Sequence, residues 1–189
     1  MGAIVRRERH GAEADLGLLA LRLAVGGLLM GHGSQKLFGW FDGPGVAGFG
    51  GFLESMGYKP GKQWATLAGL SEFGGGALTA LGLLHPLGPI ATLGAMGVAS
   101  VTVHGGKPIW AAKGGAELPL TNIAAAIALA TIGPGQYSLD HALGIRLPKQ
   151  VGMAAMCAVA AGVVVAKLDP GVLAQISGAA EDAKEAVGG

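Results

Sequence analysis

Charged side chains stand within the long apolar stretches of this sequence, where a simple membrane anchor would carry none. Arg22, His32 and Lys36 interrupt the run LGLLALRLAVGGLLMGHGSQKLFGWF (residues 16–41), and Glu72 interrupts SEFGGGALTALG. A charged group at the centre of a membrane helix costs about 3 kcal/mol even on the lenient insertion scale, so it usually faces a bundle interior or a wet cavity and has a partner. We therefore expect these groups to form an ion pair, bind a polar ligand or move protons.

Arg22 and Glu72 are the two charges placed deepest in their apolar segments. Each would be costly alone in the bilayer, and helices that follow one another in sequence usually pack side by side. We therefore expect Arg22 to pair with Glu72. The pair would either fix the register of two helices or line a polar pocket for a small headgroup, such as a quinone carbonyl or an oxyanion.

A second set of polar residues lies near the ends of apolar segments: His32, Lys36, His104 and Glu117, with Asn122 one turn inside its segment. In an alternating topology these ends share one face of the membrane, so a cluster is geometrically possible. Two histidines could bind a metal or relay protons. However, no two histidines have local ligand spacing, and a solvated or hydrogen-bonded histidine is commoner, so we predict no metal site.

The composition indicates which elements must position these residues. Hydrophobic residues make up 51% of the 189 residues and charged residues only 13%, where a soluble domain has about 25% charged residues. This predicts an all-α fold, a polytopic membrane helical bundle whose surroundings are the lipid bilayer. The net charge of +1 gives no basic field for nucleic acid. Cys157 is the only cysteine, so the chain forms no internal disulfide or dithiol relay.

The apolar segments are long enough for four core spans and a fifth near the C-terminus. After the first, residues 16–41, a run between Lys62 and Lys107 is divided by HPLG into a helical hairpin, and further spans follow at 118–132 and 151–166. The predicted organisation is a polar leader (1–15), a four-helix core (16–140), a connection with the fifth span (141–168) and a tail (169–189).

Residues 40–62 of the core are rich in glycine and aromatic residues and too interrupted to span a membrane. We expect a short interfacial helix at 46–56, with the aromatic side chains as a belt at headgroup depth. This segment would act as a lid over the bundle or as a plain anchor. The tail would form a brief surface helix or remain disordered.

Small residues predict how the helices pack. Glycine accounts for 36 residues, and small residues four apart allow membrane helices to approach closely. This spacing occurs at Gly27 and Gly31, at Ala91, Ala95 and Ala99, and at Ala126 and Ala130. At 100° per residue, a single stripe of the first helix contains Arg22, Gly26, Leu29, Gly33 and Lys36.

The positions of the lysines and arginines around the predicted spans give conflicting indications of the membrane orientation. Arg6, Arg7 and Arg9 precede the first span in a leader that we expect to be retained, and they favour a cytoplasmic N-terminus. With five spans, that orientation places Arg146 and Lys149 inside. It places four lysines outside: Lys59, Lys62, Lys107 and Lys113. The later loops therefore do not settle the orientation.

Three motifs occur in order along the core: RLAVGGLLMGHGSQKLFG (22–39), EFGGGALTALGL (72–83) and GPGQYSLD (133–140). With them, the chain resembles the DoxX family of bacterial membrane proteins. The resemblance implies a four-helix bundle in the bacterial inner (plasma) membrane, related to the small subunit of thiosulfate:quinone oxidoreductase and to proteins associated with thiol and oxidative-stress enzymes. It implies that Arg22, His32, Lys36 and Glu72 are polar core residues of the family.

Three functions remain open at this level. The first is a membrane subunit of a redox complex, binding quinone and passing electrons from a partner enzyme, with no covalently held cofactor of its own. The second is a non-catalytic accessory or scaffold subunit of a larger membrane complex. The third is a small-solute transporter or channel that uses the intramembrane polar stripe. Whether the chain is an enzyme does not follow from its residues.

Overall fold

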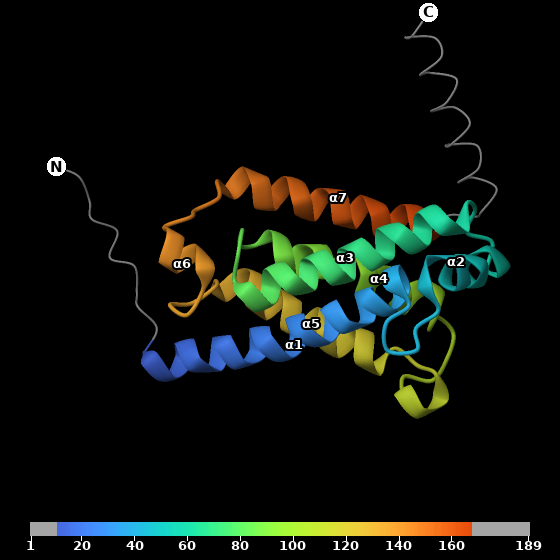
Figure 1. Ribbon diagram of the computed structural model, residues 1–189, viewed down its shortest axis with the longest axis horizontal. Coiled ribbons are helices and arrows are strands. Elements are labelled where there is room, and N and C mark those ends of the chain that lie inside the picture. The colour runs from blue at the N-terminus through green and yellow to red at the C-terminus, as the bar shows by residue number, and fades with distance from the viewer. Residues whose placement is uncertain (1–10, 168–189) are drawn as a thin grey trace, which may run out of the picture.

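A computed structural model describes residues 11–167, which form helices and connecting loops with no β-strand among them (Figure 1). The elements in chain order are α1 (Ala12–Phe38), α2 (Gly45–Ser55), α3 (Gly61–Leu81), α4 (Leu87–Thr102), the short 3₁₀ helix η1 (Ala111–Lys113), α5 (Glu117–Ile132), α6 (Leu139–Leu143) and α7 (Lys149–Lys167). The predicted all-α fold is confirmed. The leader arginines and the predicted tail lie outside the described residues.

Helix α1 organises the bundle. It begins at Ala12, earlier than the predicted span, with Glu13 and Asp15 in its first turn, where acidic groups complement the helix dipole. It ends at Gly39, whose φ of 72° is a left-handed C-cap that glycine adopts without a steric penalty. One unbroken helix therefore carries both Arg22 and Lys36.

The seam between α1 and α3 is made by glycines. Arg22, Gly26, Leu29 and Gly33 are all buried, which confirms the predicted stripe. A Cβ atom on Gly26 would lie 2.6 Å from the carbonyl oxygen of Gly76, so the two backbones are already in contact there. The predicted close approach at Gly27 and Gly31 is wrong. A Cβ atom on either of these residues would meet nothing within 4 Å.

The predicted helical hairpin is formed by α3 and α4, with a tight turn at residues 82–86. A Cβ on Gly75 of α3 would lie 3.0 Å from the side chains of both Ala91 and Thr92 of α4. Helix α5 packs on α4, and α7 covers another part of α4, where Gly97 leaves room for Val163. The small residues of α4 thus allow helices to pack on more than one of its sides.

Helix α2 agrees closely with the short helix predicted at residues 46–56. It packs against the start of α3, where a Cβ on Gly50 would lie 3.0 Å from the backbone nitrogen of Lys62. Nearby, the Tyr58 hydroxyl donates a hydrogen bond to the carbonyl of Ala166 in α7 (2.8 Å). The segment between α1 and α3 is therefore tied to the bundle at one end, whereas its depth relative to a membrane stays a prediction.

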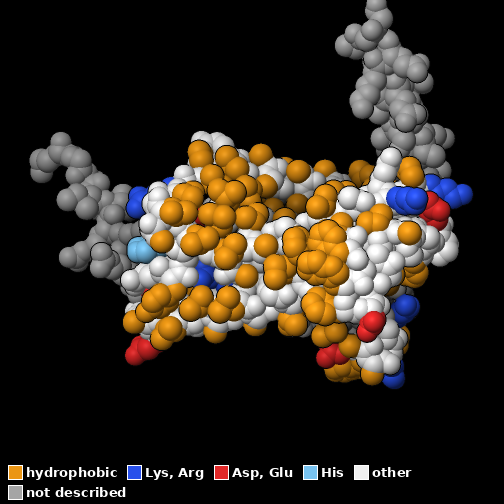
Figure 2. All heavy atoms as spheres, viewed as in Figure 1, with side chains coloured by type: hydrophobic (Ala, Val, Ile, Leu, Met, Phe, Trp, Pro, Cys, Tyr) orange, Lys and Arg blue, Asp and Glu red, His pale blue; other side chains and the backbone are white. Residues whose placement is uncertain are grey.

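Within residues 11–167, two helices are long and apolar enough to cross a membrane, α1 and the part of α7 from Lys149 to Ala166. Helices α4 and α5 are apolar but have only 16 residues each. The count of four or five spans therefore stays a prediction. Figure 2 shows apolar side chains along one flank of the bundle and most charged ones toward its two ends, a pattern that suits a lipid environment.

Candidate functional site

Glu72 pairs with Lys36, not with Arg22. The ammonium group of Lys36 near the end of α1 contacts the Glu72 carboxylate in the middle of α3, and this is the one salt bridge within residues 11–167. The Glu72 side chain is 4% exposed and the Lys36 side chain is 20% exposed. The predicted Arg22–Glu72 pair is therefore wrong, because the α1–α3 register brings a different cation to the carboxylate.

One aromatic ring lies beside the Lys36 end of this pair, and further rings of α1, α2 and α3 contact one another. The Lys36 Nζ atom lies 5.3 Å from the centre of the Phe49 ring, a distance that allows a cation–π interaction. Phe38 contacts both Trp40 and Phe73, with ring centres 5.0 and 5.4 Å apart, and Phe49 stacks on Phe52. The contacts form two groups, which we together call the aromatic cluster: Phe38, Trp40 and Phe73 in one, and Phe49 and Phe52 in the other. A buried carboxylate thus holds a cation beside flat apolar groups.

Arg22 lies toward the opposite end of the bundle and is only 3% exposed. Its terminal nitrogens donate hydrogen bonds to two backbone carbonyls, Pro134 (2.7 Å) and Tyr137 (2.5 Å). Arg22 and Lys36 are fourteen residues apart on one helix, or roughly 21 Å along its axis. The polar stripe is therefore divided into two separate centres.

Two buried aspartates accompany Arg22, and neither was predicted as a site residue. Asp15 accepts hydrogen bonds from the backbone nitrogen (3.0 Å) and the side-chain amide (2.7 Å) of Gln136. Asp140 accepts hydrogen bonds from the backbone nitrogens of Leu84 (2.8 Å) and His85 (2.7 Å). These contacts fasten the segment GPGQYSLD to α1 and to the α3–α4 turn, so this motif has a structural role here.

His85 completes this end of the bundle. Its Nε2 atom lies 3.1 Å from the carbonyl oxygen of Leu129 in α5. Burial lowers the pKa of the imidazole below its ordinary value, because the charged form is desolvated, although the Leu129 carbonyl and the Asp140 carboxylate act in the opposite direction. His85 is therefore neutral at pH 7 and acts as a hydrogen-bonding group.

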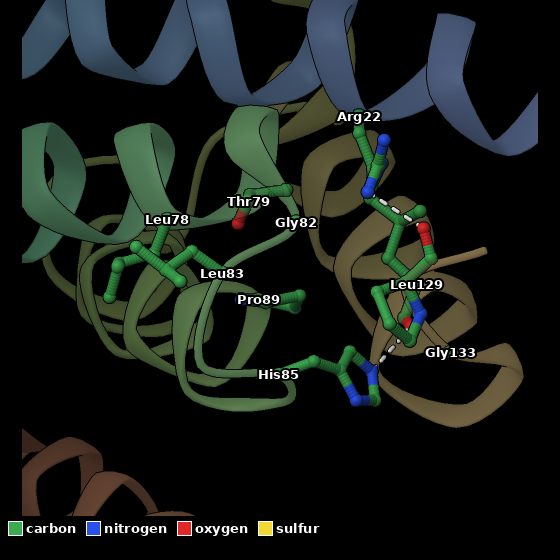
Figure 3. A pocket seen from close by; sticks show the side chains of 10 residues that line it. Arg22, Leu78, Thr79, Gly82, Leu83, His85, Pro89, Leu129 and Gly133 are labelled. Atoms are coloured by element: carbon green, nitrogen blue, oxygen red, sulfur yellow. Dashed lines mark hydrogen bonds between the residues drawn. The ribbon is translucent and has the colours of Figure 1, made fainter. Parts of the chain in front are cut away.

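A small cavity lies between these groups (Figure 3). It is lined by Arg22, Leu78, Thr79, Gly82, Leu83, His85, Pro89, Leu129, Gly133 and Pro134. In the figure, Arg22 and His85 approach from opposite sides, with Leu129 between them. The free volume of about 10 Å³ is close to what one water molecule needs, so an organic ring does not fit.

The other predicted site residues do not form a cluster. His32 lies beside Gln35 on its own helix (Nδ1 to Oε1, 3.2 Å), and His104 lies 2.7 Å from the Gly114 carbonyl oxygen. Glu117 accepts a hydrogen bond from the Ala111 nitrogen (2.8 Å). The amide of Asn122 contacts the Met96 sulfur at 3.7 Å. Each residue thus has a separate local partner, and residues 11–167 contain no group of three metal-ligating side chains.

We expect an Asp140→Asn variant to be less stable by about 1–3 kcal/mol, because an amide provides one acceptor oxygen for two buried backbone donors. Thermal unfolding in mild detergent measures the loss. The matched control is Asp42→Asn, the same change at an exposed loop residue, which should unfold like wild type. Equal unfolding temperatures for the two variants would contradict the structural role of Asp140.

An all-helical bundle with exposed apolar side chains along its surface and a charged pair held between two helices is compatible with a helical membrane protein. A family model described as DoxX matches residues 17–105, from α1 to just beyond α4. Residues 17–105 are therefore similar to the DoxX family, as the sequence motifs in this segment indicated. Comparison with curated proteins and with solved structures gave no match. Helices α5, α6 and α7 lie outside the matched segment.

Proposed function

We propose that this protein is a membrane subunit of a quinone- or thiol-linked redox complex in the bacterial plasma membrane, and that Lys36 and the aromatic cluster bind a quinone. The observation that supports it most is the position of Lys36. Its ammonium group is partly exposed, held by a buried carboxylate and placed over the Phe49 ring. A cation beside flat apolar rings suits a ligand that is a flat ring with carbonyl oxygens.

The residues present fit such a ring. Lys36 would donate a hydrogen bond to a quinone carbonyl, because an ammonium group has three donors and Glu72 uses only part of them. Phe38, Trp40 and Phe52 would provide the apolar contact, since their exposed fractions are 52%, 55% and 45%. When bound, a quinone can accept two electrons and two protons. Glu72 would act as a positioning residue that fixes the Lys36 side chain.

The site is open at the surface rather than enclosed. Quinones dissolve in the bilayer, so a surface of exposed rings would be reached sideways from lipid. The cavity beside Arg22 cannot serve, because its volume is that of a water molecule. The proposal therefore uses Lys36 and Glu72 and leaves Arg22 out of the binding site.

The electrons would come from a protein partner. Cys157, the single cysteine, is exposed on α7, so dithiol chemistry requires groups from another chain. The relation to the small subunit of thiosulfate:quinone oxidoreductase, implied by the sequence resemblance, fits the same arrangement. In it the membrane subunit presents the quinone and a partner enzyme oxidises the thiol or sulfur compound.

A quinone titration of the full chain in nanodiscs tests this proposal. We expect Lys36→Met to weaken binding by roughly 10- to 100-fold, because a hydrogen bond to a charged group contributes about 1.5–3 kcal/mol. The matched control is Lys107→Met, the same change at an exposed residue of the loop before α5, which should bind like wild type.

Folding must be separated from binding in this test. Lys36→Met leaves the Glu72 carboxylate buried without a cation, so the Lys36→Met/Glu72→Gln double variant provides a neutral pair of similar volume. A folded double variant that has lost quinone binding supports the proposal. Equal binding by wild type and both variants, or none by wild type, would contradict it and favour an accessory subunit instead.

A further inference from the structure

The loop between α4 and α5 exposes apolar side chains at one end of the bundle. We call residues 103–116 the η1 loop. Ile109 is 53% exposed and Trp110 is 60% exposed, and the apolar surface continues onto α5, where Leu118 and Leu120 are exposed as well. An exposed apolar patch with polar residues around it usually marks a surface that binds a partner or a membrane.

Hydrogen bonds within the η1 loop hold these side chains in place. The Glu117 backbone nitrogen donates to the Ile109 carbonyl (2.9 Å), and the Gly115 backbone nitrogen donates to the Trp110 carbonyl (3.0 Å). A Cβ atom on Gly115 would overlap the Pro108 carbonyl, so the two arms of the loop are in backbone contact. Backbone groups that bond to each other cost less to move from water into a less polar layer. The backbone of this loop is therefore suited to the lipid boundary.

Two lysines flank the apolar residues of the η1 loop. Lys107 and Lys113 are both exposed. The Lys107 Nζ atom lies close to the residue that follows Lys113, because a Cβ atom on Gly114 would be 3.6 Å from it. The nearest carboxylate along the chain belongs to Glu117, and it accepts a hydrogen bond from the Ala111 nitrogen. An apolar surface edged by cations is complementary to a layer of anionic phospholipids, in which acyl chains lie beneath phosphates.

The lengths of α4 and α5 give the η1 loop a place in a bilayer. Each helix has 16 residues, or about 24 Å at 1.5 Å per residue, whereas the hydrocarbon core of a bilayer is about 30 Å thick. The loop joins the end of α4 to the start of α5, at the end of the bundle that carries α2 (Figure 1). An apolar loop here extends both helices toward the headgroups, whereas a loop in water would leave both about 6 Å short.

We propose that the η1 loop is a docking surface for anionic phospholipids of the bilayer. Ile109 and Trp110 lie at the boundary between acyl chains and headgroups, and Lys107 and Lys113 bind the headgroup phosphates. The loop thereby sets the depth of α4 and α5 in the membrane. It contributes no group to the proposed quinone site, so a change at Lys107 leaves quinone binding unaltered.

Quenching of tryptophan emission by brominated lipids tests the position of the loop. The chain has three tryptophans, Trp40, Trp64 and Trp110, so the full chain with Trp40→Phe and Trp64→Phe emits from Trp110 alone. This variant is placed in vesicles of phosphatidylcholine and phosphatidylglycerol, either with bromine on the acyl chains near the headgroups or with iodide on both sides of the membrane. We expect bromine to quench most of the Trp110 emission and iodide to quench little.

Two patterns of quenching would overturn the proposal. Strong quenching by iodide with little by bromine would place the loop in water, as for a loop that binds a protein partner absent from the vesicles. Little quenching by either would mean that protein covers Trp110, such as a second copy of this chain.

Selectivity for the anionic lipid tests the two lysines. In vesicles of equal composition, bromine is carried either by phosphatidylglycerol or by phosphatidylcholine. We expect the lipid around Trp110 to be enriched severalfold in phosphatidylglycerol, and we expect Lys107→Gln/Lys113→Gln to remove most of this enrichment. The matched control, Arg146→Gln/Lys149→Gln, removes two exposed cations at the start of α7 and should keep it. Equal quenching by the two lipids with the lysines present, or enrichment unchanged in the lysine variant, would overturn the proposal.

Discussion

A Gly33→Ala variant should lose most of the stability of the α1–α3 pair. A Cβ atom at this position would overlap the backbone of Phe73, even more closely than a Cβ on Gly26 would approach Gly76. Backbone atoms cannot move aside as the end of a flexible side chain can, so the two helices would have to separate. We expect a loss of about 3 kcal/mol or more, at the upper end of the range for overpacked cores.

The matched control for this substitution lies two residues earlier on the same helix. Gly31→Ala makes the same chemical change where a Cβ atom would meet nothing within 4 Å. Alanine favours an α-helix over glycine by about 1 kcal/mol, so this variant should be as stable as wild type or more stable. Unfolding by SDS in mixed micelles measures both variants. Similar unfolding curves for Gly33→Ala and Gly31→Ala would show that the seam is not where the structure places it.

Breaking the Lys36–Glu72 pair should also lower the stability of the bundle strongly. The loss should differ between the substitution that removes Lys36 and the one that removes Glu72. Lys36→Met leaves a carboxylate that is 4% exposed without its cation, whereas Glu72→Gln leaves an ammonium group that is 20% exposed and can turn toward solvent. Removing one partner of a buried pair costs about 3–5 kcal/mol when the remaining charge stays buried. We therefore expect Lys36→Met to approach this range and Glu72→Gln to remain below it.

The Lys36→Met/Glu72→Gln double variant should recover much of the loss, because a neutral pair leaves no charge behind. The coupling energy from this double-mutant cycle in unfolding measurements tests the contact. In a parallel cycle, Arg22→Met and Glu72→Gln should have additive effects, because Arg22 bonds to the carbonyls of Pro134 and Tyr137 instead. Strong coupling of Arg22 to Glu72, with none between Lys36 and Glu72, would contradict the structure.

The pattern of the sequence was enough to predict the face of α1 that packs, but not the partners along it. Hydrophobic periodicity places Arg22, Gly26 and Gly33 on one stripe, and all three are buried. Periodicity does not determine the axial register of one helix relative to its neighbour. This register decides whether Glu72 meets Arg22 or Lys36. Here the backbone contacts of Gly26 with Gly76 and of Gly33 with Phe73 determine that position.

The Arg22 end of the bundle was harder to predict for another reason. Arg22 bonds to backbone carbonyls, and Asp140 bonds to backbone nitrogens, so neither contact depends on a recognisable partner side chain. Asp15 seemed part of a polar leader, although it lies inside α1 and is 2% exposed. The motif GPGQYSLD was the available signal, since a polar segment that follows an apolar helix needs buried partners to be held in place.

The glycine spacing misled in a similar way. Gly27 and Gly31 have the four-residue spacing of close helix contacts, yet a Cβ atom on either of them would meet nothing within 4 Å. The contact instead uses Gly26 and Gly33, seven residues apart on the face that also carries Leu29. Spacing alone could not choose between two glycine pairs on adjacent faces, whereas the buried polar side chain of Arg22 on the same stripe could have done so.

Photoaffinity labelling with an azido-quinone, followed by mapping of the labelled peptides, tests the central claim most directly. The claim is that the partly exposed Lys36 and the aromatic cluster form the ligand-binding end of the bundle. Labels should fall within residues 38–52 and near Phe73, they should compete with unlabelled quinone, and they should be lost in the folded Lys36→Met/Glu72→Gln variant. Competed labels at residues 129–137 beside Arg22, or labels at the aromatic cluster unchanged in that variant, would contradict the claim.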